Sequence, residues 1–319
     1  MSDNRYTWVN GRLAPKAEAA VSPFDHGFLY GDGAFEGIRI YNHRIFKFEE
    51  HLDRFYDSAK VLEINIDRRI SRADLREAIF ESVRANEIFD KGYIRLVVSR
   101  GAGDLGINPN KCTEPPTVVI IVDTLKLYPP QDYETGLPVI ICNTRKLNRT
   151  GYQSRVKSLN YLNNIYGIME VNRVGAKEGI LLTDEGYVAE ATADNVFVVK
   201  HGMVKTPPCS VGALGGITRE VVLQLCNEKG LPAKEELMTA FDLYTADEVF
   251  LTGTGAELVP VSSVDGRSIG VGGAGPVTTR ILGWFREYAS STGTPIPTHP
   301  EATGNGVGNH VHAAVVPAT

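Results

Sequence analysis

Apolar and polar residues alternate in short runs through the first 48 residues, and the alternation returns between residues 93 and 122. A period of two predicts strands that bury one face. Apolar residues at helical spacing predict helices over 49–62 and 71–86, the second with Ser71 in a capping position. Strands with helices gathered between them indicate an α+β unit, which we place at residues 1–122.

The pattern breaks at residues 123–134, where adjacent prolines indicate an interdomain linker. We expect a larger, β-rich α/β domain over residues 135–290. Residues 291–319 are rich in Ser, Thr, Gly, Pro and Asn, which predicts a disordered tail. The elements expected in the second domain are strands over 137–142, 180–183, 187–191, 196–200, 203–205, 248–252 and 258–261, and helices after residue 157, over 218–229 and over 276–288.

The composition of the 319 residues is that of an ordinary globular protein, with 43% hydrophobic and 22% charged residues. A net charge of -5 gives no reason to expect a nucleic acid or an anionic membrane as partner. The four cysteines lie far apart and show neither zinc spacing nor a disulfide framework. Because no segment has signal-peptide or membrane-spanning character, we expect a cytoplasmic protein.

Lys157 lies in the stretch 154–164, directly before apolar residues at helical spacing. Ser158 is expected to cap that helix, which would place Lys157 just outside the first turn. The helix dipole and partial burial would both favour the neutral amine. A neutral lysine can form a Schiff base with a carbonyl compound. The simpler interpretation is a solvated lysine, since most lysines are exposed.

Four further features could complete a site, although each has an ordinary interpretation. Glu190 could pair with a protonated ring nitrogen, or it could be an acid on the wet face of a strand. The glycine-rich loop 212–219 runs into a helix, whose free amides could bind phosphate or could be capped by Thr218. Residues 252–256 form a hydroxyl-plus-glycine turn. Arg54 would suit bidentate phosphate binding if it faced the same pocket.

The stretch 101–106 (GAGDLG) matches the glycine spacing of dinucleotide-binding loops. That interpretation requires a helix to open directly after the glycines. Pro109 interrupts the following residues, so we favour a loop that covers a pocket. A nicotinamide-dependent dehydrogenase therefore remains only as an alternative.

Taken together, the amine, the acid and the phosphate-binding groups are what pyridoxal phosphate requires of its protein. In these motifs the chain resembles the class IV aminotransferases, the fold-type IV pyridoxal phosphate enzymes, and most of all the branched-chain amino acid aminotransferases. The resemblance extends from Trp8 to Tyr288. The motifs that carry it are YGDGAFEGIR (30–39), HLDR (51–54), KSLNYLNN (157–164), EATADN (190–195), GITR (216–219) and GTGAE (253–257).

The resemblance implies a two-domain D-amino acid aminotransferase-like fold and a homodimer as the minimal unit. Lys157 would hold the cofactor as a Schiff base and then move the proton as general base and acid. Glu190 would pair with the pyridine nitrogen, Tyr161 would bind the phenolic oxygen, and Leu214 would pack on the ring. The groups implied for the phosphate are Arg54, the amides of Ile217 and Thr218, and Thr254.

The resemblance also implies transfer of the amino group of L-leucine, L-isoleucine or L-valine to 2-oxoglutarate by a ping-pong mechanism. Tyr93 and the amides near Gly255 and Ala256 would take the α-carboxylate. Arg95 would meet the distal carboxylate of glutamate, which an apolar pocket could not bind without a partner. The other residues implied at the substrate are Tyr30, Phe35, Gly37, Arg39 and, from the neighbouring subunit, Leu105 and Ile107.

Two departures from the family pattern leave more than one substrate class possible. Gly255 stands where the family leads us to expect alanine, and the loop 100–107 carries Arg100 and Asp104 near positions that admit D-amino acids or primary amines. A D-amino acid or (R)-amine aminotransferase is therefore an alternative, as is aminodeoxychorismate lyase, against which Tyr93 and Arg95 argue. A catalytically silent binding protein would have to carry every group of this site without using it.

Overall fold

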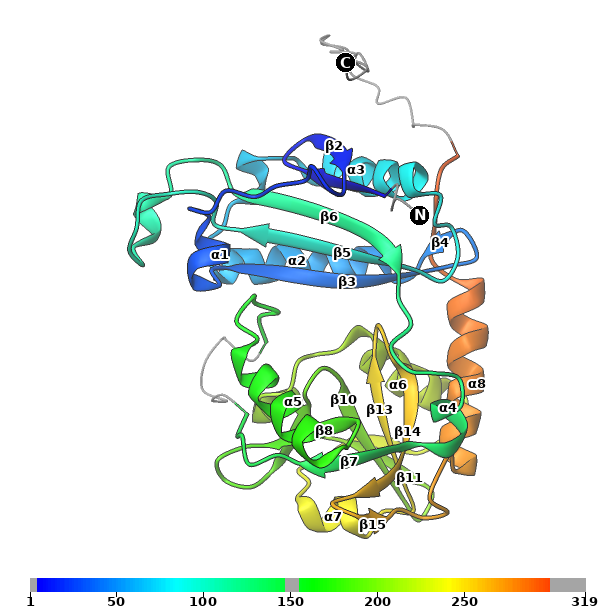
Figure 1. Ribbon diagram of the computed structural model, residues 1–319. Coiled ribbons are helices and arrows are strands. Elements are labelled where there is room, and N and C mark those ends of the chain that lie inside the picture. Colours follow the sequence, from blue (N-terminus) through cyan, green and yellow to red (C-terminus); the bar gives the residue numbers. More distant parts are fainter. Residues whose placement is uncertain (1–4, 147–154, 299–319) are drawn as a thin grey trace.

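The computed structural model describes residues 5–146 and 155–298, which form two domains with one sheet each (Figure 1). The first sheet takes its strands from both ends of the chain. Its domain contains β1 (Tyr6–Val9), β2 (Arg12–Pro15), α1 (His26–Tyr30), β3 (Gly33–Tyr41), β4 (Arg44–Ile45), α2 (Phe48–Val61), η1 (Ile66–Arg68), α3 (Arg72–Asn86), β5 (Gly92–Ser99), η2 (Pro109–Lys111), β6 (Thr117–Thr124) and β16 (Thr294–Pro295).

The seven strands of the first sheet are ordered β16-β4-β3-β5-β6-β1-β2, and every pairing is antiparallel. Helices α2 and α3 cover one face, where alternate residues of β3 such as Ile38 and Ile40 are fully buried. Side chains on a strand alternate between faces. Phe35, Gly37 and Arg39 therefore lie on the other face of the sheet, toward the second domain.

The second domain contains a larger, mixed sheet with helices on both sides. Its elements are α4 (Asp132–Thr135), β7 (Leu137–Ile141), α5 (Leu162–Val174), β8 (Glu178–Leu182), β9 (Val188–Ala191), β10 (Asn195–Lys200), β11 (Met203–Thr206), η4 (Cys209–Val211), α6 (Ile217–Glu228), β12 (Ala233–Glu235), α7 (Ala240–Tyr244), β13 (Glu248–Gly253), β14 (Glu257–Val264), β15 (Arg267–Ser268) and α8 (Pro276–Ser291).

The strands of this sheet are ordered β12-β11-β10-β13-β14-β7-β8-β9, with β15 added beside β14. The pairs β7–β8 and β7–β14 are parallel, whereas β8–β9 and β10–β11 are antiparallel. The predicted meander over these four strands is wrong at its middle connection, because β9 ends the strand order while β10 pairs with β11 and β13. One apolar core lies beneath α7, and another lies between the sheet, α6 and α8. Because α6 and β13 belong to this second core, the loops that precede α6 and follow β13 rest on a packed base.

The chain passes twice between the domains on the side of α8, once through residues 125–131 and once through α8 into β16 (Figure 1). The disorder predicted from residue 291 is wrong for 291–298, since Thr294–Pro295 pairs with β4. The rest of that predicted tail, 299–319, lies outside the described residues. Helix α8 has 16 residues, and no helix in 5–146 and 155–298 is long and apolar enough to cross a bilayer.

Candidate active site

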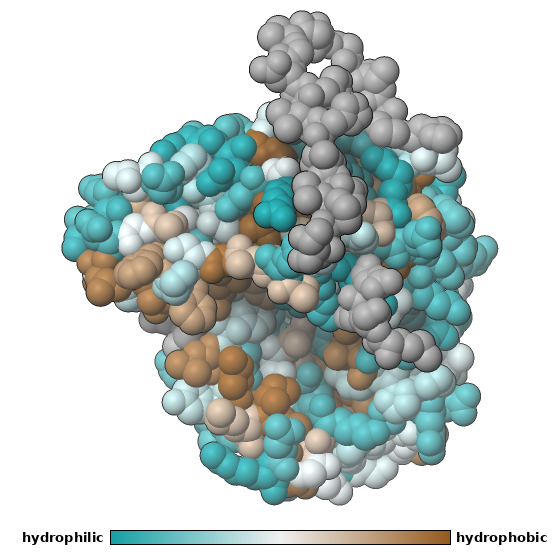
Figure 2. All heavy atoms as spheres, turned by 45° about the horizontal axis from the view of Figure 1, so that its top comes forward, coloured by the Kyte–Doolittle hydropathy of each residue, from teal (hydrophilic) through white to brown (hydrophobic). Residues whose placement is uncertain are grey.

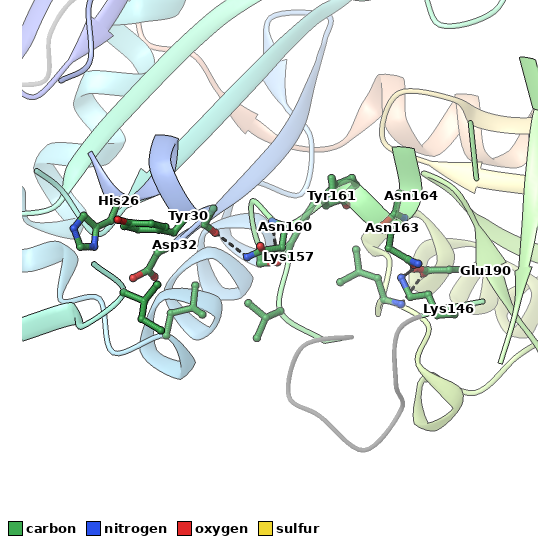
Figure 3. A pocket seen from close by; sticks show the side chains of 16 residues that line it. His26, Tyr30, Asp32, Lys146, Lys157, Asn160, Tyr161, Asn163, Asn164 and Glu190 are labelled. Atoms are coloured by element: carbon green, nitrogen blue, oxygen red, sulfur yellow. Dashed lines mark hydrogen bonds and ion pairs between the residues drawn. The ribbon is translucent and has the colours of Figure 1, made fainter. Parts of the chain in front are cut away.

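A cavity of about 470 Å³ lies between the two domains, and a second cavity of about 50 Å³ adjoins it. Figure 3 shows Lys157 between Tyr30 of the first domain and Glu190 of the second. The residues that line both cavities are Lys157, Tyr161, Asn164, Glu190 and Leu214. The amine and the acid singled out from the sequence therefore share one site, together with Tyr161 and Leu214.

Backbone contacts with the first sheet hold Lys157 in place. The Lys157 carbonyl accepts from the amide of Phe35 at 2.9 Å, and the Leu159 amide donates to the Gly33 carbonyl at 2.9 Å. Ser158 forms an isolated bridge with Ala34 of β3. The segment thus lies beside β3 as a short extra strand, although it belongs by sequence to the second half of the chain.

The predicted cap of the following helix is wrong. Helix α5 begins at Leu162 with Tyr161 as its N-cap, so Ser158 lies outside the helix and does not cap it. Pairing with β3 keeps residues 157–159 extended. The helix dipole falls off within the first turn, so the effect on Lys157 that was predicted from this dipole does not apply.

The Lys157 amine lies in an aromatic corner. Its Nζ donates to the Tyr161 hydroxyl at 3.1 Å and lies 4.7 Å from the centroid of the Phe35 ring. The Phe35 and Tyr161 rings meet edge to face at 5.1 Å. The simpler interpretation of a solvated lysine therefore fails, because the amine points into the protein between two rings.

Glu190 is buried on β9 and is held on both oxygens. Oε1 pairs with the Lys146 amine, and Oε2 accepts from the Leu214 amide at 2.7 Å (Figure 3). Asn195 lies 3.5 Å from the same Oε2. The interpretation of Glu190 as an acid on a wet strand face is excluded. Lys146 was missed from the sequence, because nothing in its local pattern indicates a partner 44 residues away.

The smaller cavity ends at the start of α6, where the chain presents groups suited to an anion. Gly216 is the N-cap and no side chain caps the helix, so the first-turn amides of Ile217 and Thr218 are available. The interpretation of Thr218 as an ordinary cap is therefore wrong. Arg54 and Thr254 line the same cavity. An uncapped helix start beside a guanidinium and hydroxyls is a suitable anion site.

Arg54 is held by a buried carboxylate that the sequence analysis did not single out. Its Nε and Nη2 donate to Glu36 at 2.7 and 2.8 Å, and its Nη1 donates to the Gly215 carbonyl at 2.7 Å. His51 Nδ1 lies 2.8 Å from the same carboxylate. Burial alone would raise the pKa of Glu36, but the charge and hydrogen bonds of Arg54, with those of His51, lower it to about 2.

Four of the residues implied at the substrate form one cluster on β3 and β5. Arg95 lies 4.4 Å from the Phe35 ring centroid and donates to the Tyr93 hydroxyl at 3.0 Å. A methyl group at Gly37 would overlap that hydroxyl, so the glycine makes room for Tyr93. Because Phe35 also contacts Lys157, the cluster borders the amine.

The other implied substrate residues divide into two groups. Tyr30 and Ile107 line the larger cavity, and the Tyr30 hydroxyl accepts from the Gly106 amide at 2.8 Å. Leu105 is 62% exposed and lines neither cavity. Gly255 and Ala256 follow Thr254 in the turn between β13 and β14, and Ala256 is fully buried.

Arg39 does not reach the cavities in the described chain. Its Nη1 donates to the Leu125 carbonyl at 3.1 Å, and its Nη2 lies 3.9 Å from Glu257. Tyr41 and Arg286 bind the same carboxylate. Arg39 therefore connects β3 to the linker and to the base of the turn that carries Thr254, and its contact with substrate stays a prediction.

This arrangement of an amine, an acid and an anion site is suited to amino-group transfer, and the comparisons with known proteins assign the class. A family model for class IV aminotransferases matches residues 33–264. The chain belongs to this family and has its two-domain, fold-type IV architecture, which confirms the resemblance stated from the sequence.

The names of the relatives also specify the substrate class of those proteins. The chain is 44% identical over 289 residues to a putative branched-chain-amino-acid aminotransferase of Methanocaldococcus jannaschii, covering 91% of this chain and 98% of that one. It superimposes on the branched-chain amino acid aminotransferase of Escherichia coli with a TM-score of 0.86 at 34% identity, covering 90% and 95% of the two chains. The T.th. branched-chain amino acid aminotransferase with pyridoxamine 5'-phosphate gives 0.83 at 36% identity, covering 89% and 94%.

Proposed function

We propose that this chain is a pyridoxal-phosphate-dependent aminotransferase that moves the amino group of L-leucine, L-isoleucine or L-valine to 2-oxoglutarate. The observation that carries the proposal is the joining of two cavities. One presents the Lys157 amine and the Glu190 carboxylate, and the other ends at the uncapped start of α6 beside Arg54. The names of the relatives support the substrate class.

The residues present fit the cofactor. Thr252, whose Oγ1 is a buried hydroxyl without a hydrogen-bond partner in the described chain, is among the residues that line the smaller cavity, where the chemistry of the donors suits a phosphate. Arg54, Thr254 and the first-turn amides of α6 would hold the same phosphate. Leu214 would pack against the ring, since it lines both cavities beside Glu190.

Pyridoxal phosphate supplies an electron-poor ring into which the electrons of the substrate Cα–H bond delocalise. Lys157 would hold the cofactor and then, as a free amine, move the proton from the substrate Cα. The Tyr161 hydroxyl, 3.1 Å from Lys157 Nζ, orients that amine and would bind the phenolic oxygen of the cofactor. Glu190, fixed by Lys146 and the Leu214 amide, would present a carboxylate to the ring nitrogen.

The cluster on β3 and β5 is suited to two kinds of substrate. Phe35 offers an apolar face next to Lys157 for a branched side chain. Arg95 is held on that ring and on Tyr93 by cation–π contacts, and it is the cation within the cluster that could meet the distal carboxylate of glutamate. Tyr93 would take the α-carboxylate with the turn that contains Gly255 and Ala256.

We further propose a homodimer. Apolar side chains at helical spacing normally face a core. On α5, however, Leu162 is 61% exposed and Tyr166 53%, and near the cavity Phe28 is 76% and Ile107 84% exposed. Figure 2 shows hydrophobic surface on both domains at one end of the molecule. Large exposed apolar patches mark interaction sites. A second copy would cover this apolar surface, and its Leu105 would reach the pocket of the first copy, whereas Ile107 already lines the cavity of its own chain.

The first test is chemical. Borohydride treatment of the purified protein followed by peptide mapping should place the reduced cofactor on Lys157, and Lys157→Ala should abolish transamination. Modification at another lysine, or full activity of the variant, would contradict the assignment.

Amino transfer from L-leucine, D-alanine and (R)-1-phenylethylamine to 2-oxoglutarate then tests the substrate, since activity on D-alanine and (R)-1-phenylethylamine alone would exclude the branched-chain amino acids. Release of pyruvate from aminodeoxychorismate would instead indicate the lyase. Sedimentation equilibrium tests the dimer.

A further inference from the structure

The turn that carries Thr254 ends at a residue with an unusual backbone conformation. Gly253 and Glu257 are paired across β13 and β14, and residues 254–256 form the loop between them. The φ angle of Glu257 is 59°, which lies in the left-handed region. Glycine adopts this region at no steric cost, whereas a residue with a Cβ atom persists there only where its surroundings hold it. The contacts of the Glu257 side chain therefore matter for the turn.

The Glu257 carboxylate binds groups from two other parts of the fold. Its Oε1 accepts from the Tyr41 hydroxyl at 3.0 Å and lies 3.9 Å from Arg39 Nη2. Its Oε2 accepts from Arg286 Nε at 3.1 Å. Tyr41 and Arg39 belong to β3 of the first domain, and Arg286 belongs to α8. Because the Glu257 side chain is only 13% exposed, these contacts are largely shielded from water and attach the turn of the second domain to the first domain.

The rest of the turn is held by the segment that joins the domains and by α4. The Tyr133 hydroxyl donates to the Ala256 carbonyl at 2.9 Å. A methyl group at Gly255 would lie 3.1 Å from the Leu125 side chain, so the linker packs directly on the loop. In Figure 1 the β13–β14 turn points toward the first domain beside the linker. Thr254 lines the smaller cavity, so the contacts of its neighbours determine where its hydroxyl lies.

Strand β3 also holds the other side of the anion site. Its Glu36 accepts from Arg54 Nε and Nη2 at 2.7 and 2.8 Å, and Arg54 lines the smaller cavity with Thr254. Arg54 comes from α2 of the first domain, whereas Thr254 comes from the second domain. One strand therefore holds Arg54 through Glu36 and the turn with Thr254 through Glu257.

We propose that Glu257 is a positioning residue for the cofactor phosphate. Its carboxylate holds the β13–β14 turn against β3 and so keeps Thr254 beside Arg54 in the smaller cavity. Glu257 itself lines neither cavity, so it acts through Thr254 and not by contact with the phosphate. The inference rests on the proposed cofactor.

The sign of the effect separates positioning from electrostatics. Removing a negative charge near an anion site favours the anion, and here it also leaves Arg39 and Arg286 without their acid. Charge alone therefore predicts that Glu257→Gly binds a phosphate more tightly. Positioning predicts weaker binding, because the Thr254 hydroxyl is no longer held in place. Loss of one donor to a charged group corresponds to about tenfold in affinity.

The test compares pyridoxal phosphate with pyridoxal, which lacks the phosphate. The dissociation constants of both compounds for the cofactor-free, full-length chain are measured from their change in absorbance, with circular dichroism as a check of folding. Glu257→Gly removes the carboxylate and tolerates the left-handed backbone. It should bind pyridoxal phosphate about tenfold more weakly and pyridoxal as wild type does. A general loss of structure would weaken both compounds equally.

Two other variants serve as controls. Glu287→Gln removes an exposed acid next to Arg286 on α8 and should follow wild type. Tyr41→Phe removes the hydroxyl that binds Glu257, so it should weaken the binding of pyridoxal phosphate but not of pyridoxal. Added to Glu257→Gly it should have no further effect, because both changes break the same contact. Tyr41→Phe alone takes the place of Glu257→Gly if that variant fails to fold.

The outcomes separate the inference from the proposed function. Unchanged or tighter binding of pyridoxal phosphate by Glu257→Gly and Tyr41→Phe would overturn the inference, and so would equal weakening of both compounds. Absence of any pyridoxal phosphate binding by wild type would overturn the proposed function, and the inference with it.

Discussion

Replacing Glu36 by glutamine should destabilise the first domain more than any exchange of an exposed acid. Glu36 is completely buried between Arg54 and His51. Lowering its pKa from 4.5 to about 2 corresponds to about 3 kcal/mol of stability at neutral pH, at about 1.4 kcal/mol per unit. Removing one partner of a buried pair costs about 3–5 kcal/mol, because the other charge stays behind. The pKa shift of Glu36 and the cost of breaking a buried pair therefore give the same magnitude for the loss of stability.

The measurement is urea unfolding at pH 7, followed by fluorescence and extrapolated to water. Glu36→Gln should lower the free energy of unfolding by about 3–5 kcal/mol. Glu50→Gln is the matched control: Glu50 is exposed on α2, the helix that carries Arg54, and pairs with Lys47 at the surface, where a pair contributes about 0–1 kcal/mol.

Acidification provides a second readout of the same pair. Because folding lowers the Glu36 pKa, its contribution is complete above pH 4.5 and is lost as the pH falls toward 2. Wild type should therefore lose about 3 kcal/mol more than Glu36→Gln across this window. If the two Gln variants differ by less than about 1 kcal/mol at pH 7, the buried pair does not stabilise the domain and the reasoning is refuted.

Three further changes have separate readouts. Gly37→Ala should displace the Tyr93 hydroxyl and raise KM for L-leucine about 10- to 100-fold with cofactor absorbance unchanged; an unchanged KM would exclude Tyr93 from substrate binding. Glu248→Gln should cost about 1 kcal/mol in thermal unfolding, since both Glu248 oxygens accept first-turn amides of α8, and an unaltered Tm would count against this cap. Asp194→Asn should stabilise the cofactor-free chain at pH 8 but not at about pH 4, because folding raises the pKa of this acid and stability is lost as pH rises toward about 8; equal effects at both pH values would contradict that sign.

The sequence was sufficient for features that depend on local pattern. The period of two located β3, β5 and β6, and glycines before apolar residues at helical spacing located the start of α6. The motifs around Lys157 and Glu190 identified two residues whose side chains line one cavity.

Contacts distant in sequence could not be read in this way. Ser158 was a plausible cap by local rules, but pairing of residues 157–159 with β3 keeps the backbone extended and delays α5. Lys146 and Glu36 have no local signal, because their partners are brought to them only by the sheets. Strand β16 has two residues, which is too short for any periodicity. The contact of the Arg39 guanidinium with the linker also had no local signal, because Leu125 lies 86 residues further along the chain.

The short strand formed by residues 157–159 divides the catalytic apparatus between two bodies. Its backbone is bonded to β3, so the reactive nitrogen is carried with Phe35 and the first sheet. Glu190 and the start of α6 are carried by the second sheet. Sliding of one sheet over the other would change the separation between Lys157 Nζ and the Glu190 carboxylate, and in the proposed mechanism the geometry of the two domains would then control turnover.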